Sequence, residues 1–165
     1  MSEANNCILV NNNQIWFEGE ITSNSIHRLM FEIAKQPSKV DLFVCSNGGC
    51  VQSGLSFVDF LNANQKKVTF IGHGYLHSAA SYWLFSKCKT YLFASTEIMF
   101  HPMTHYLEDR SEALEGKIIV KDNLTRFINN LQSSKGFSCD WENKTFYFYA
   151  DEFVRRGIVD GYWKG

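Results

Sequence analysis

Residues 74–81 have the sequence Gly74-Tyr75-Leu76-His77-Ser78-Ala79-Ala80-Ser81, and this stretch decides both the fold and the search for function. It follows the short β-rich run Val68-Thr69-Phe70-Ile71, and the small residues around Ser78 suit a tight turn from a strand into a helix. Ser78 is therefore a candidate nucleophile. The candidate base is His101, which lies 23 residues later, after the apolar run in Ile98-Met99-Phe100-His101-Pro102.

A second signal lies upstream, where the expected apolar strand Val40-Asp41-Leu42-Phe43-Val44-Cys45 runs into Ser46-Asn47-Gly48-Gly49. Glycine lets the backbone turn sharply, and the N–H groups of such a turn are free to point at an anion. A nucleophile, a base and oxyanion donors are the three parts of a serine hydrolase. The sequence therefore predicts hydrolytic chemistry.

Strands are expected to alternate with helices through the first hundred residues, which predicts a mostly parallel α/β sheet with right-handed crossovers. Sites in such sheets form at the carboxyl ends of strands, where the glycine turn, Ser78 and His101 all fall. The expected strands are 15–21, 40–45, 68–71, 90–93, 97–100 and 146–149. The expected helices are one capped by Ser23 or Ser25 and ending near Ala34, then 51–64, 78–84, 109–133 and 151–156 with Gly157 as its cap.

Composition predicts a single domain over residues 1–165. Sixteen basic and seventeen acidic residues give a net charge of -1, so we expect neither a nucleic-acid nor a membrane partner. The first residues are polar and lack the apolar core of a signal peptide. Five cysteines, an odd number without CxxC spacing, indicate reduced thiols. We therefore expect a soluble, cytoplasmic protein.

The order of these features resembles the ClpP-type serine peptidases of the ClpP/crotonase fold. The matching pieces are the strand with Ser46 to Gly54, the stretch from Gly74 to Ser81, the segment from Ile98 to Pro102, and the ending Ala150 to Asp160. Four pieces in the family's order are specific, although each alone is weak. With the expected strand at Ile15, the resemblance covers nearly the whole chain.

The resemblance implies repeated ββα units, a mostly parallel sheet and a protruding handle helix at about 109–134. It implies Ser78 as nucleophile, His101 as general base, and the backbone N–H groups of Gly49 and Ala79 as the oxyanion hole. It also implies a homo-oligomeric ring that encloses its sites and cleaves unfolded or short peptides, without a cofactor.

The chain departs from the family's pattern in three places. Asn47 stands where the glycine turn usually has proline, which the turn tolerates. Thr145 stands at the position of the triad's acid, and it accepts a hydrogen bond but carries no charge. Asp140, Glu142 or Asp151 are possible substitutes. Only a few residues precede Ile15, so the family's leading helix and axial loops are largely missing. Their absence argues against an ATPase unfoldase partner. In this respect the chain resembles compact phage-encoded members of the family.

Two other functions stay open at this point. A ClpP-like structural or regulatory subunit with little or no activity is favoured by Thr145 and opposed by the presence of both Ser78 and His101. An acyl-thioester enzyme of the crotonase branch is opposed by His101 at the ClpP position. A metal site is not expected at either His73 with His77 or His101 with His105, because neither pair is expected to lie on a helix; His73 and His105 are expected in loops.

Overall fold

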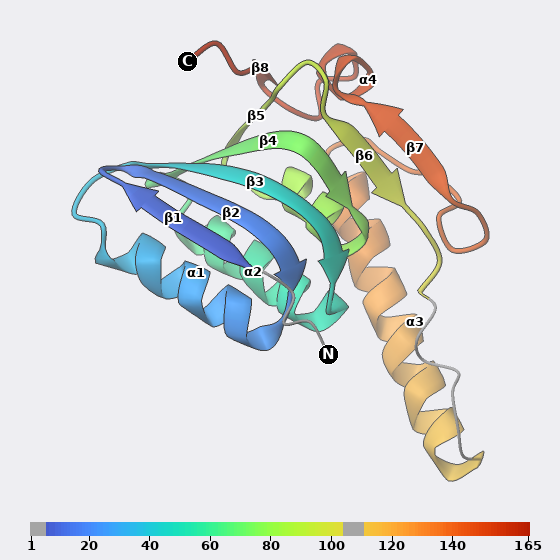
Figure 1. Ribbon diagram of the computed structural model, residues 1–165. Coiled ribbons are helices and arrows are strands. Elements are labelled where there is room, and N and C mark those ends of the chain that lie inside the picture. The colour runs from blue at the N-terminus through green and yellow to red at the C-terminus, as the bar shows by residue number, and fades with distance from the viewer. Residues whose placement is uncertain (1–5, 104–110) are drawn as a thin grey trace.

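The computed structural model describes residues 6–103 and 111–165, with the backbone alone for 111–120. Helices and strands alternate along the chain (Figure 1). The elements are β1 (Cys7–Asn11), β2 (Gln14–Ile21), α1 (Ser23–Lys35), β3 (Val40–Gly49), α2 (Val51–Ala63), β4 (Val68–His77), the 3-10 helix η1 (Ser78–Phe85), β5 (Lys89–Leu92), β6 (Glu97–Phe100), α3 (Ser111–Ser133), β7 (Phe146–Tyr149), α4 (Ala150–Arg155) and β8 (Gly161–Tyr162).

The strands form one eight-stranded sheet in the order β1-β2-β3-β4-β5-β8, and β6 pairs with β4 on one side and β7 on the other. The pairs β2–β3, β3–β4, β4–β5, β4–β6 and β5–β8 are parallel. The pairs β1–β2 and β6–β7 are antiparallel. The prediction of a mostly parallel sheet is therefore confirmed.

Several predicted boundaries were wrong. The polar, Asn-rich start contains β1, an edge strand joined to β2 through Asn12 at φ 54°. The strand β8 was also missed; it has only two residues. The cap of α1 is Thr22, whose side chain accepts a hydrogen bond from the N–H of Ser25, and not either serine. Both β3 and β4 run on through their glycines, because neighbouring strands pair with those residues.

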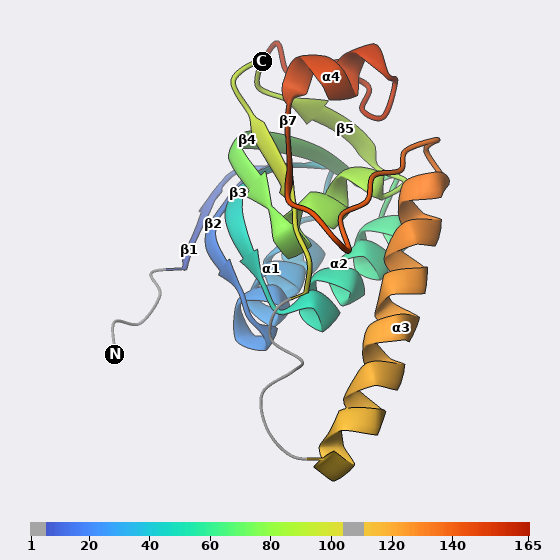
Figure 2. The same ribbon diagram turned by 90° about the vertical axis from the view of Figure 1, so that its right-hand side faces the viewer.

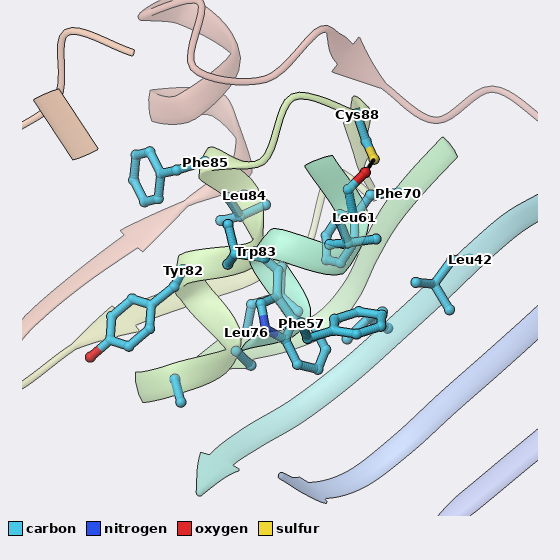
Figure 3. Close-up of a cluster of buried hydrophobic side chains, with 14 of the residues drawn as sticks. Leu42, Phe57, Leu61, Phe70, Leu76, Tyr82, Trp83, Leu84, Phe85 and Cys88 are labelled. Atoms are coloured by element: carbon cyan, nitrogen blue, oxygen red, sulfur yellow. Dashed lines mark hydrogen bonds between the residues drawn. The ribbon is translucent and has the colours of Figure 1, made fainter. Parts of the chain in front are cut away.

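The core lies between the sheet and one layer of helices. Figures 1 and 2 show α1 and α2 beneath the same face of the sheet, while no described helix lies across the opposite face of β1–β4. Buried side chains from β3, α2, β4 and η1 meet around Trp83 (Figure 3). The indole N–H of Trp83 donates to the carbonyl of Gly54 at 2.9 Å, which ties η1 to α2.

The helix α3 extends away from the sheet in both ribbon views, as the handle prediction required (Figures 1 and 2). Its last turns contact η1, and Ile128 is fully buried there. Further along the chain, five phenylalanines pack together and attach β6 and β7 to η1 and α4: Phe85, Phe100, Phe137, Phe148 and Phe153. In the described part of the chain, no helix combines the length and apolar character of a membrane span.

Candidate active site

Ser78 occupies a strained turn at the carboxyl end of β4. It is the first residue of η1, its φ is +54°, and it is half-buried. A non-glycine residue in the left-handed region costs about 1–3 kcal/mol and is held there by its surroundings. Ser81, fully buried, donates its hydroxyl to the carbonyl of Ser78 at 2.6 Å. The predicted strand-to-helix turn is therefore present, and this serine contact supports it.

The glycines at the end of β3 pack directly against this turn. Gly48 and Gly49 have φ values of +95° and +141°. A Cβ atom on Gly48 would lie 2.7 Å from the Cβ of Ser78 and 2.7 Å from the carbonyl oxygen of His77. Only glycine fits there, since real Cβ atoms do not approach other atoms so closely. The structure thus brings the glycine segment and Ser78 together.

The same glycines limit which N–H groups can hold an oxyanion. The N–H of Gly48 donates to the hydroxyl of Ser46 at 3.1 Å, and that hydroxyl donates to the carbonyl of Gly19 at 2.6 Å. Gly48 is therefore engaged, and of the two glycines Gly49 stays the candidate donor. Ala79 lies in the first turn of η1, where N–H groups lack helical partners, and no capping side chain from the described residues covers them. The oxyanion hole of Gly49 and Ala79 stays a prediction.

His101 and Thr145 leave the sheet at the end where Ser78 lies. In the parallel ladder of β4 and β6, His77 is opposite Met99. In the antiparallel ladder of β6 and β7, Phe100 is opposite Phe146, so His101 and Thr145 are the next residues on the two strands. His101 is half-buried and Thr145 is exposed. The three predicted triad positions therefore lie next to the ends of three adjacent strands, β4, β6 and β7.

The three predicted triad residues are not hydrogen bonded to one another. Among the described side chains, no hydrogen bond joins Ser78 to His101 or His101 to Thr145. Catalytic hydrogen bonds are often long in a free enzyme and tighten when substrate binds. Two of the three possible substitute acids have other partners, since Asp140 accepts from Asn143 and Glu142 accepts from Asn129.

Sequence reasoning missed a polar cluster beside the turn. The imidazole of His77 lies 2.8 Å from a carboxylate oxygen of Glu97, measured from Nε2. Tyr149 donates its hydroxyl to the other oxygen of Glu97 at 3.2 Å. The sequence places these residues far apart, and only the register of β4, β6 and β7 brings them together. The imidazole of His77 is thus engaged with Glu97.

Two other histidines were expected in loops, and the structure describes one of them. His73 lies within β4 and not in a loop, and burial lowers the pKa of its imidazole although Glu18 opposes this. His105 lies outside the described residues. Among the side chains of residues 6–103 and 121–165, no three His, Cys, Asp or Glu residues gather as metal ligands would.

One thiol adjoins the glycine segment. Cys50 follows Gly49 and caps α2. Partial burial raises the pKa of its thiol, but hydrogen bonds from Ser53 and Gln52 outweigh this effect and leave the pKa below its ordinary value. All five cysteines of the chain are free thiols.

A comparison with models of known protein families shows which family the chain belongs to. The model described as Clp protease matches residues 5–162, nearly the whole chain. The chain belongs to the Clp protease family. Its mixed α/β fold, with an eight-stranded sheet, is the ClpP fold that the sequence predicted. In this Clp protease family member, the turn at Ser78, the glycines of β3, the end of β6 and the start of β7 lie at the same end of the sheet.

Proposed function

We propose that this Clp protease family member is a serine endopeptidase with Ser78 as nucleophile and His101 as general base. The contact of Gly48 with the strained turn at Ser78 is the observation that carries the proposal. It joins the two segments that would supply the nucleophile and the oxyanion donors. Substrates would be short peptides or unfolded chains, because only these enter an enclosed assembly.

The reaction follows from the roles of these groups. Ser78 Oγ attacks the carbonyl carbon of the peptide bond while His101 accepts the hydroxyl proton. The N–H groups of Gly49 and Ala79 donate to the oxyanion of the tetrahedral intermediate. The intermediate collapses to an acyl-enzyme, and the leaving amine takes the proton from His101. Water then attacks the ester with His101 again as base, releasing the acid and restoring Ser78.

Thr145 sets the expected level of activity. An uncharged residue orients the imidazole but does not stabilise the imidazolium, and loss of the acid's charge costs about 10⁴ in turnover in a serine-protease triad. We therefore expect slow turnover. The second candidate, a ClpP-like subunit with structural or regulatory function, is favoured by the exposure of Thr145 and by the other partners of Asp140 and Glu142.

Assembly is part of the proposal. Homo-oligomeric rings would enclose the sites, and α3, which extends away from the sheet, is the element we assign to contacts between rings (Figure 2). No cofactor takes part in the reaction, and the proposal includes no ATPase partner. The free thiols favour a reducing, cytoplasmic location.

The test is hydrolysis of short fluorogenic peptides by the assembled protein, with light scattering to measure assembly. Ser78→Ala should abolish hydrolysis, whereas Ser134→Ala, which removes an exposed hydroxyl at the end of α3, should leave it unchanged. Assembled wild-type protein that hydrolyses no peptide would instead support the structural or regulatory subunit.

A further inference from the structure

The alignment of the proposed triad depends on a narrow connection. β6 and β7 lie off the main path of the sheet, and β6 joins β4 through only three residue pairs, from Tyr75 opposite Glu97 to His77 opposite Met99. Ser78 belongs to one side of this connection, while His101 and Thr145 belong to the other. A small shift between β4 and β6 would therefore separate the nucleophile from its base.

The cluster of His77, Glu97 and Tyr149 spans two strand pairs, β4 with β6 and β6 with β7. The contact of His77 with Glu97 (2.8 Å) spans β4 and β6, and the hydrogen bond of Tyr149 to Glu97 (3.2 Å) spans β6 and β7. His77 directly precedes Ser78 in the chain, and Glu97 lies four residues before His101. Tyr149 lies four residues after Thr145, on the antiparallel strand. Four residues of strand span about 13 Å.

His77 and Glu97 are partly sheltered from solvent, whereas Tyr149 is 55% exposed. The side chain of His77 is 15% exposed and that of Glu97 is 31% exposed. The rings of Tyr75 and Tyr147 lie near the imidazole of His77, with centroids 5.3 Å and 6.3 Å away. The hydrogen bond to the Glu97 carboxylate raises the pKa of Tyr149, which keeps its hydroxyl protonated as a donor.

The cluster lies on the face that carries the base. Side chains alternate along a strand, so Glu97 and Met99 share the face opposite Ile98 and Phe100. Ile98 and Phe100 are buried on the helix side, where aromatic packing already fixes β6. On the other face, the polar contacts of His77, Glu97 and Tyr149 connect β4 to β6 and β6 to β7.

We infer that His77, Glu97 and Tyr149 are positioning residues of the peptidase, which hold His101 and Thr145 in register with Ser78. This inference rests on the proposed function. In a chain whose triad lacks a charged acid, the register of these strands replaces part of the orientation that a carboxylate would give the imidazole.

The experiment measures kcat and KM for peptide hydrolysis, together with the imidazole NMR signals of His101. The variants are Glu97→Gln and Tyr149→Phe, and Tyr147→Phe is the matched control. Tyr147 lies on the same strand and face and is 60% exposed against 55% for Tyr149, but its hydroxyl does not bond to Glu97. Urea unfolding shows that each variant is folded.

We expect Glu97→Gln to lower kcat on the order of tenfold, the change expected when a hydrogen bond to a charged group is lost. Tyr149→Phe should lower kcat about threefold, and KM should change less than about twofold in both variants. The His101 signal should move in both variants and stay in place in Tyr147→Phe.

Unchanged kcat in folded Glu97→Gln and Tyr149→Phe would overturn the inference while the proposed function stands. A wild-type protein without hydrolysis would instead overturn the proposed function. The NMR signal then decides alone, because a His101 signal that does not respond to Glu97→Gln contradicts any positioning by this cluster.

Discussion

Gly48→Ala tests the contact between the glycine segment and Ser78. A new Cβ atom at φ +95° would lie 2.7 Å from Ser78 Cβ and 2.7 Å from the His77 carbonyl, so the turn must move by several tenths of an ångström. Gly48→Ala should therefore lower the free energy of unfolding by about 1–3 kcal/mol through backbone strain, and by about as much again through overpacking. A displacement near 1 Å at a reacting group costs about 10² in rate.

The matched control is Gly157→Ala. Gly157 also has a positive φ, +69°, but no atom of the described residues outside its immediate chain neighbours lies within 4 Å of the point that a new Cβ would occupy. This variant should lose only about 1–2 kcal/mol of unfolding free energy and keep its activity. Urea unfolding gives the free energies, and the rate of reaction with a fluorophosphonate gives the reactivity of Ser78. Equal stability of the two variants, with wild-type reactivity in folded Gly48→Ala, would refute the packing argument.

Three further predictions concern the core and the triad. Burial raises the pKa of the Cys88 thiol to about 11. Since the unfolded thiol titrates near pH 8.5, the stability contributed by this group is complete below that pH and is lost as the pH rises toward 11. Cys88→Ala should remove about 3 kcal/mol of this pH-dependent loss of unfolding free energy, measured by urea unfolding in reductant. Trp83→Phe removes the indole donor to the buried carbonyl of Gly54 and leaves a cavity, which should cost about 3 kcal/mol, and a loss below about 0.5 kcal/mol in the same assay would contradict the packing. Thr145→Asp should raise kcat for peptide hydrolysis more than about tenfold, because a carboxylate stabilises the His101 imidazolium; an unchanged kcat would show that this position does not face the base.

Much of the fold was predictable because its signals are local. Apolar runs and helical spacing placed most elements to within a few residues, and glycines marked the turn beside Ser78. The edge strand β1 was missed because it is short and mostly exposed, so its residues show no alternation of buried apolar and exposed polar side chains. The extensions of β3 and β4 were missed because strand neighbours, and not propensity, hold their glycines in the sheet.

The site was predictable only as a set of positions. Ser78, His101 and Thr145 follow from motifs and their order, and the structure places them at the ends of adjacent strands. The cluster of His77, Glu97 and Tyr149 was not predictable, since it depends on the register of three strands that are separated in the sequence. Its partners become visible only when each residue has a known neighbour across the sheet.

The measurement that tests the central claim most directly is intact-mass labelling of the assembled protein with a fluorophosphonate. We expect one added label per chain, absent in Ser78→Ala and strongly reduced in His101→Ala, because the hydroxyl needs its base to become a nucleophile. Labelling that persists in Ser78→Ala, or no labelling of folded and assembled wild-type protein, would contradict an activated serine at this turn.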